Sequence, residues 1–360
     1  MKIAIMGAGL SGLACALTLE KNGLTPTILD NRRCAGDRFV NGEILLPMLE
    51  ESFSDPLIQL SEAYGIYLQP TNNITALTLH SENKTAQLTG QLGFINLRGR
   101  VENSFESQLA RQLKTKILFN SPYDYTDILK EFTHIVLAVG DFRYTEEIQR
   151  VKSSLAVTLK GAIVAGNFNQ REVAAWLDNT IAPKGYCYLI PLSGQEANIT
   201  LAYPEYPEAQ GLSQNKLWDK FFERVCKDTQ QDLRVTDQFE IHQYRMGISA
   251  IPRIGNTFFV GNCLGTMMPA LGFGQLPSML SGIYAAQDLL GQSSYQKTAK
   301  SIYQSYNHSL TLRKFLESLD NAKLDTLIDL VGTPLANRLL NNRRISLLKI
   351  ISRLLAPLFG

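Results

Sequence analysis

The spacing of apolar positions predicts strands and helices in an alternating order. Lys2–Met6 is a short apolar run typical of a buried strand, residues 13–22 form an apolar helical stretch, and Thr25–Leu29 is a second strand. Two later apolar runs, Thr133–Val139 and Thr257–Val260, have a polar entry and a glycine exit. Such runs are typical of parallel strands that are covered on both faces. The pattern therefore predicts an α/β domain with a parallel sheet.

The middle of the chain has a different pattern. Short β-rich pieces at Gly161–Phe168, Tyr186–Pro191 and Ala197–Ala202 are separated by Gly, Pro and Asn, as expected for an antiparallel sheet. An amphipathic helix at Gln214–Lys227 covers this sheet, and a strand at Thr236–Arg245 returns the chain to the first domain. We therefore expect a Rossmann-like dinucleotide-binding domain with an inserted antiparallel substrate domain, α+β overall, and a helical C-terminal region.

The domain limits follow from where these patterns change. We expect the dinucleotide-binding domain to be discontinuous, at residues 1–155 and 245–292, with the inserted substrate domain at 156–244 and the helical region at 293–360. We find neither internal repeats nor low-complexity tracts.

Composition narrows the function. The chain has 360 residues, of which 45% are hydrophobic and 19% charged, so a large buried interior is expected. A net charge of +2 is too small for a surface that binds nucleic acid. Four histidines and five cysteines show no metal-ligand spacing, which predicts neither a metal site nor a disulfide framework and fits a reducing, cytoplasmic setting. Since the apolar run at 3–19 is interrupted by glycines, we expect no signal peptide and no membrane span.

A glycine-rich loop joins the first strand to the first helix. Its sequence is Gly7-Ala8-Gly9-Leu10-Ser11-Gly12. The first glycine permits a tight turn, the second lets the backbone approach a pyrophosphate, and the third allows close packing of helix on strand. Asp30 ends the second strand, where a carboxylate can accept hydrogen bonds from a ribose. This combination predicts binding of an adenine dinucleotide and leaves NAD and FAD open.

Two later segments also end in glycine. The strand at 133–139 ends in Ala138-Val139-Gly140, and the strand at 257–260 leads into Gly261-Asn262. The turn Pro269-Ala270-Leu271-Gly272-Phe273-Gly274 follows, and then a helical stretch at Leu276–Leu290 that contains several small residues. Small residues allow close packing of this helix on its neighbours.

In this order the motifs resemble the geranylgeranyl reductase group of FAD-dependent oxidoreductases, within the p-hydroxybenzoate hydroxylase-like flavoproteins. That superfamily has the glycine-rich βαβ unit, a middle strand ending in A-T-G, and a late G-D followed by a P-x-x-G-x-G turn and a long helix. The reductase group adds a motif close to P-x-x-Y-x-W-x-F-P, for which this chain has Pro183–Pro191. These landmarks span residues 1 to about 291.

The resemblance implies one non-covalent FAD and a set of site residues. Tyr186 and Tyr188 would line the substrate cavity on the side of the flavin, and Cys34, beside Arg32 and Arg33, would lie near the isoalloxazine as a catalytic candidate or else as a small buried residue. An arginine near the helical stretch 104–113 contacts the cofactor phosphates in the family, which points to Arg98 ahead of Arg100. The expected cofactor-binding residues are Gly7, Gly9, Leu10, Ser11, Gly12, Asp30, Asn31, Arg33, Arg98, Ala138, Gly140, Gly261, Asn262, Gly272, Phe273 and Gly274.

The chain departs from the family pattern at three places. Asn262 replaces the usual Asp, which keeps an acceptor for a ribityl hydroxyl but removes a charge. The segment after Gly140 lacks the D-G-x-x-S pattern of many hydroxylases, which favours a reductase over a hydroxylase. Tyr188 and Ile190 stand where the reductase group has Trp and Phe, so the substrate can differ.

The implied activity is reduction of carbon–carbon double bonds in an isoprenoid or another apolar lipid by hydride transfer from reduced flavin. A flavin monooxygenase that hydroxylates a small substrate and a non-catalytic flavin- or lipid-binding protein remain as alternatives. No second glycine-rich dinucleotide loop follows residue 140, so we expect a transient electron donor, either NAD(P)H or a ferredoxin-like carrier.

The C-terminal segment is basic and amphipathic. Five cations and no acid follow Asp329. Leucine and isoleucine at 347, 348, 351, 354, 355 and 358 recur at helical spacing, whereas Arg343, Ser346, Lys349 and Arg353 fall on the other face. Such a helix can lie in an anionic membrane interface or pack on the protein body, and the pattern does not distinguish the two.

Overall fold

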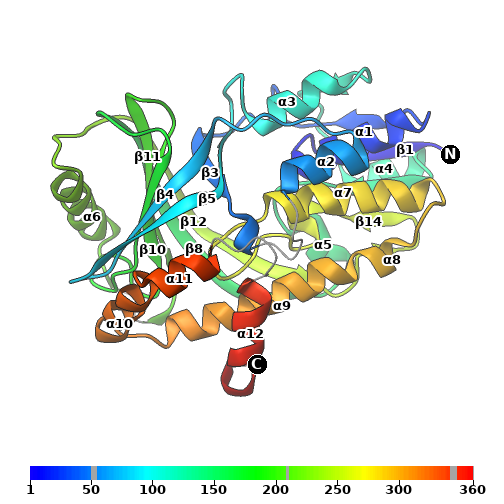
Figure 1. The fold of residues 1–360 in the computed structure, drawn as a ribbon. Coiled ribbons are helices and arrows are strands. Elements are labelled where there is room, and N and C mark those ends of the chain that lie inside the picture. Colours follow the sequence, from blue (N-terminus) through cyan, green and yellow to red (C-terminus); the bar gives the residue numbers. More distant parts are fainter. Residues whose placement is uncertain (50–54, 208–210, 341–346, 360) are drawn as a thin grey trace.

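The computed structural model describes residues 1–49, 55–207, 211–340 and 347–359. Two sheets and a set of C-terminal helices make up the fold (Figure 1). The first sheet has the strand order β13 (Arg253–Ile254), β14 (Thr257–Phe259), β7 (His134–Leu137), β1 (Ile3–Met6), β2 (Thr27–Leu29) and β6 (Ile117–Leu118). All of its pairings are parallel except that of β13 with β14. The predicted Rossmann-like sheet is confirmed.

Helices cover this sheet on both sides. Helix α1 (Leu10–Lys21) packs against α7 (Gln275–Leu289), and α3 (Phe105–Gln112) packs against α1. The other short helices near this sheet are α2 (Pro56–Tyr64), α4 (Tyr125–Glu131) and α5 (Arg143–Ile148). Helix α1 begins three residues before the predicted start at residue 13, because Gly9 is its N-cap and the end of the glycine loop forms the first helical turn.

The second sheet is larger and curled. Its strand order is β12 (Arg234–Ser249), β8 (Val151–Ala165), β11 (Glu196–Pro204), β10 (Tyr186–Pro191), β9 (Glu172–Trp176), β4 (Asn72–His80), β5 (Thr85–Arg98) and β3 (Asn41–Leu45). Most pairings are antiparallel, but β4 pairs with β9 in parallel. Helix α6 (Gln214–Thr229) covers one face through Leu217, Phe221 and Val225.

This sheet extends beyond the predicted insertion at 156–244. Strands β3, β4 and β5 come from residues 41–98, which the sequence analysis assigned to the first domain, and β8 and β12 each cross a predicted limit. The reason is the parallel pairing of Ala76–His80 with Glu172–Trp176, which joins two segments far apart in the chain. Such long-range pairing leaves no local signal in the sequence.

The C-terminal helices lie along both sheets. Helix α9 (Lys300–Glu317) follows α8 (Tyr295–Thr298), and α10 (Asn321–Val331), α11 (Pro334–Leu340) and α12 (Leu347–Phe359) complete the chain. Helix α12 packs on α9, with Leu348 and Ser352 buried, and its C-terminal end projects from the molecule (Figure 1). Arg343 and Ser346 of the predicted polar face lie outside the described residues. No helix in the described part of the chain combines the length and the apolar character needed to cross a bilayer.

Candidate functional site

The glycine loop is held by very close backbone contacts. Gly7 has φ +113°, and a Cβ on it would lie 2.5 Å from the Ala138 carbonyl oxygen. A Cβ on Gly12 would lie 2.0 Å from the Gly7 carbonyl oxygen. On the other side of α1, a Cβ on Gly282 of α7 would lie 2.0 Å from the Ser11 carbonyl oxygen. These distances leave no room for a side chain, so β1, α1, β7 and α7 approach one another as closely as only glycine allows.

Three other glycines at the site face open space. A Cβ on Gly9 or on Gly140 would have no atom within 4 Å, and a Cβ on Gly272 would meet only the Tyr186 hydroxyl, at 3.8 Å. Gly9 starts α1, whose N-cap makes no side-chain hydrogen bond. The N–H groups of the first turn therefore point out of the helix without a capping side chain, which is the geometry that binds a phosphate.

Asp30 stabilises this loop through hydrogen bonds. Its carboxylate accepts hydrogen bonds from the backbone N–H of Ala8, at 2.6 Å, and of Arg32, at 2.8 Å. A carboxylate has further lone pairs, so it can still accept from a ribose. Asn31 and Arg33 are exposed, and Arg33 forms an ion pair with Asp37. Their predicted contact with a cofactor remains a prediction.

Arg98 lies in an ion cluster with Arg38, Glu43 and Glu106, in which Arg98 and Glu106 are the most buried members. Its guanidinium is 2.8 Å from both Glu43 and Glu106. Burial opposes its charge, but the two carboxylates outweigh this effect and raise the pKa of Arg98. The same pairing overcomes burial to lower the pKa of Glu106. Since its charge is already compensated, Arg98 is poorly suited to the predicted phosphate contact. Arg100 pairs with Asp237 at the surface.

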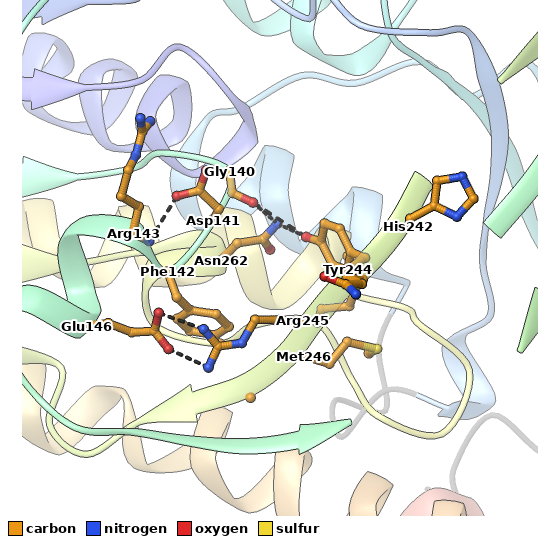
Figure 2. Close-up of a pocket in the computed structure, with 14 residues that line it drawn as sticks. Gly140, Asp141, Phe142, Arg143, Glu146, His242, Tyr244, Arg245, Met246 and Asn262 are labelled. Carbon is orange, nitrogen blue, oxygen red and sulfur yellow. Dashed lines mark hydrogen bonds and ion pairs between the residues drawn. The ribbon is translucent and has the colours of Figure 1, made fainter. Parts of the chain in front are cut away.

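Asn262 contacts a tyrosine from the second sheet. Its Nδ2 donates to the Tyr244 hydroxyl at 2.6 Å and to the Gly140 carbonyl at 3.1 Å, and Figure 2 shows the two side chains directed toward each other beside Gly140. Burial raises the pKa of Tyr244 to about 12, so its hydroxyl stays protonated at neutral pH. This contact joins the ends of β7 and β14 to β12.

A cavity of about 320 Å³ lies next to this contact (Figure 2). It is bordered by the end of β7, by α5 and by β12. Arg245 and Glu146 form an ion pair on its wall, and Phe142, Met246 and Met267 supply apolar surface. Tyr186 and Tyr188 do not line this cavity, and their place in the wall of a substrate cavity stays a prediction.

Tyr186 and Tyr188 instead lie against the turn Pro269–Gly274. The Tyr186 hydroxyl donates to the Leu271 carbonyl at 2.5 Å, and the two tyrosine rings are 6.0 Å apart. Tyr188 and Phe273 belong to one apolar cluster. Burial raises the pKa of Tyr188 to about 12 and that of Tyr186 well above its usual range. Both phenols are therefore neutral near pH 7, and the Tyr186 hydroxyl donates to the turn.

Helix α9 supports the same turn from behind. The Ser309 hydroxyl oxygen accepts from the Ala270 N–H at 3.0 Å. Arg313, only 5% exposed, pairs with Glu317 and donates to the Lys184 carbonyl at 2.7 Å. Lys184 has φ +54° and lies two residues before Tyr186. A strained residue persists only where its surroundings hold it, so Arg313 helps to position the start of β10.

Cys34 is a free, exposed cysteine in the loop that follows β2. The alternative of a small buried residue is therefore wrong. Its predicted catalytic role is untested by this placement.

No sequence pattern points to Tyr244, to Arg313 or to the carboxylate partners of Arg98. Tyr244 lies at the end of the predicted strand 236–245, next to a register shift between Ile241 and Tyr244 that re-aims its side chain. Glu106 and Arg313 occupy helices in which a charged residue is usually solvated. Their burial follows from contacts with distant segments.

Comparison with known proteins gives similarity to solved structures only. No protein-family model and no curated protein matches the sequence. A geranylgeranyl bacteriochlorophyll reductase-like protein from Thermoplasma acidophilum has a TM-score of 0.72 at 14% identity, covering 98% of each chain. A flavin-dependent brominase has a TM-score of 0.68 at 11% identity, covering 99% of this chain and 98% of its own.

A third similar structure is 2-methyl-3-hydroxypyridine-5-carboxylic acid oxygenase. Its TM-score is 0.59 at 17% identity, and the match covers 95% of this chain and 92% of the oxygenase. The matches extend over nearly the whole length of each protein, and they confirm the resemblance that the ordered motifs predict at the level of the fold. The chain has the same fold as these three solved structures.

Proposed function

We propose that the chain binds one FAD between the glycine loop and the turn Pro269–Gly274. The open space at Gly9 and the uncapped start of α1 suit the pyrophosphate, Asp30 suits the ribose, and Gly140 with Asn262 suits the chain that leads to the ring. Heat denaturation of the purified yellow protein should release FAD and neither FMN nor NAD. A colourless protein that FAD does not reconstitute would contradict the proposal.

The reaction that this site supports best is reduction of carbon–carbon double bonds in an isoprenoid or another apolar lipid. The observation that carries it is the Tyr186 hydroxyl, a neutral donor at the Leu271 carbonyl, whose ring lies beside Tyr188 of the apolar cluster. The hydride for one carbon of the double bond would come from reduced FAD held at this site. Tyr186 would supply the proton for the other carbon after its O–H turns away from Leu271, and water would then return a proton to the phenolate.

Electrons come from a separate, transient donor, either NAD(P)H or a ferredoxin-like carrier. The chain has one glycine-rich dinucleotide loop, at Gly7–Gly12, and this loop is assigned to FAD. The reductase-like neighbour supports the reductase assignment.

A flavin monooxygenase is the second candidate, since an oxygenase and a brominase share the fold. A flavin- or lipid-binding protein without turnover is the third. Anaerobic reduction with dithionite, followed by addition of a polyprenyl lipid in detergent, separates the three. The reductase yields reoxidised flavin and product that has gained one hydrogen pair per double bond, measured by mass spectrometry. A monooxygenase needs oxygen, and a binding protein yields no product under either condition.

Tyr186→Phe tests the proton donor. It should retain FAD and lower the rate of lipid reduction by roughly 100-fold, the usual range for loss of a general acid. Tyr203→Phe, on the neighbouring strand β11, is the matched control. An unchanged rate in Tyr186→Phe would exclude this residue as the donor.

A further inference from the structure

Exposed apolar side chains gather on the C-terminal helices. Leu335 of α11 is 69% exposed and Leu354 of α12 is 72% exposed, and Leu330, Leu339 and Ile350 are also more than 40% exposed. In the other described parts of the chain, large exposed apolar residues are spread over separate elements. Large exposed apolar side chains on successive helices point to a contact surface.

The two helices repeat one arrangement. Leu335, Arg338 and Leu339 have the spacing i, i+3, i+4, and Ile350, Arg353 and Leu354 have the same spacing. Residues with this spacing share one face of a helix. Each helix therefore exposes two apolar side chains with an arginine between them. We call these two helix faces, with three residues each, the C-terminal face.

The charge on this face is of one sign. Arg338 and Arg353 are exposed and form no ion pair with any residue that the structure describes. No acidic residue follows Asp329 in the sequence. A long arginine side chain can lay its stem on apolar surface while its guanidinium reaches a polar, anionic layer.

Two other residues of the C-terminal helices contact the surroundings of the candidate site. Leu340, next to Leu339 on α11, and Val331 of α10 pack against an apolar cluster that also contains Met48, Tyr188 and Phe273. This cluster connects the C-terminal helices with the turn Pro269–Gly274. An apolar substrate that arrives at the C-terminal face is thus separated from the site by apolar residues.

We propose that the C-terminal face docks on the surface of an anionic lipid bilayer. Only the inference that the docked protein takes its substrate from that bilayer rests on the proposed function. Within the described residues no helix can span the bilayer, so the two helices lie in its interface. Each basic residue near an anionic surface strengthens binding by about fivefold.

A second copy of the chain fits this face less well. In a symmetric dimer the same surface would meet itself, bringing Arg338 and Arg353 of one protomer close to those of the other. Like charges brought together without acids oppose association. Anionic head groups supply the missing negative charge.

Flotation with lipid vesicles tests the proposal. The native protein should bind phosphatidylcholine vesicles that contain phosphatidylglycerol, bind weakly to phosphatidylcholine alone, and be released by salt. Arg338→Glu with Arg353→Glu, and separately Leu335→Glu with Leu354→Glu, should each lower the bound fraction by at least roughly tenfold. FAD content and melting temperature of these variants report whether the fold is intact.

Matched controls lie on other elements. Lys220→Glu with Lys227→Glu on α6 removes the same number of cations, and Leu129→Glu on α4 removes an exposed leucine. These should bind vesicles as the native protein does. Equal loss of binding in the controls, unchanged binding in the C-terminal variants, or binding that ignores phosphatidylglycerol would overturn the proposal. So would a stable dimer that Leu335→Glu with Leu354→Glu dissociates.

Turnover separates this proposal from the proposed function. With a short, water-soluble prenyl substrate the C-terminal variants should reduce double bonds at the native rate. If the native protein binds vesicles but reduces nothing, docking stands and the reductase assignment fails. If it reduces the soluble substrate but does not bind vesicles, the reverse holds.

Discussion

The loop Gly7–Gly12 and the turn Pro269–Gly274 are both rich in glycine, yet different contacts hold them in place. Backbone atoms confine the loop, because Gly7 lies against the Ala138 carbonyl and Gly12 lies against the Gly7 carbonyl. The Asp30 carboxylate also accepts a hydrogen bond from the Ala8 N–H. The turn is held by side chains from elsewhere, through the Tyr186 hydroxyl on Leu271 and the Ser309 hydroxyl on Ala270.

This difference separates two properties of the proposed site. Substitutions in the loop should act on binding of the dinucleotide, because its backbone forms the cradle. Substitutions around the turn should act on stability and on the surroundings of the flavin ring, because side chains from β10 and α9 hold it. The following experiments test that separation.

Gly9→Val should have the largest effect. The backbone at Gly9 has φ −86°, which valine adopts, and no atom lies within 4 Å of the added Cβ, so the fold should persist. The side chain would occupy the space proposed for the pyrophosphate, and FAD affinity should fall by roughly 100-fold or more. Titration with FAD measures this. Gly194→Val, in the β10–β11 turn, is the control, and native affinity in Gly9→Val would refute the assignment of the loop.

Arg313→Gln should destabilise the turn region without loss of FAD binding at the glycine loop. It removes a buried guanidinium that holds Lys184 and leaves Glu317 without its cation, which should lower the free energy of unfolding by about 2–4 kcal/mol. Urea denaturation measures the loss. Removing the exposed cation of the Arg111–Glu102 pair, by Arg111→Gln, should cost at most about 0.5 kcal/mol.

The FAD absorption spectrum of Arg313→Gln should shift while the FAD affinity stays native. Lower affinity with an unchanged spectrum would show that the two ends of the site are not separable.

A smaller loss of stability is expected at alkaline pH, through Tyr188 beside the turn. Burial raises the pKa of Tyr188 from 10.0 to about 12 in the folded protein. The folded state thus favours the neutral phenol, and the stability that this phenol contributes is complete below pH 10 and is lost as pH rises toward about 12. Denaturation midpoints should fall across this window, and less steeply in Tyr188→Phe. Tyr67→Phe, at an exposed position, should keep the native slope; identical slopes in all three proteins would contradict this account.

Cys34→Ser should have the smallest effect. The thiol is exposed on the loop after β2, and an exposed substitution of similar size rarely changes stability by more than about 0.5 kcal/mol. We expect native FAD content, melting temperature and rate of lipid reduction. A rate loss of about 100-fold would instead assign Cys34 the catalytic role that the family resemblance implies.

The sequence predicted those parts of the site that depend on neighbouring residues. Local signatures mark the glycine loop with Asp30, the strands that precede Gly140 and Gly261, and strand Tyr186–Pro191, and the structure contains each of them. Turn geometry and the periodicity of strands and helices act over a few residues, so a sequence shows them directly.

Tertiary structure alone decided which of these parts meet. The pairing of β4 with β9 brought residues 72–98 into the second sheet, and burial paired Arg98 with Glu43 and Glu106. The same packing brought Arg313 within hydrogen-bond distance of the Lys184 carbonyl, and the Tyr244 hydroxyl within hydrogen-bond distance of Asn262. Whether a charged side chain is solvated or is paired inside the protein depends on residues that are far away in the sequence. A local sequence pattern therefore cannot show it.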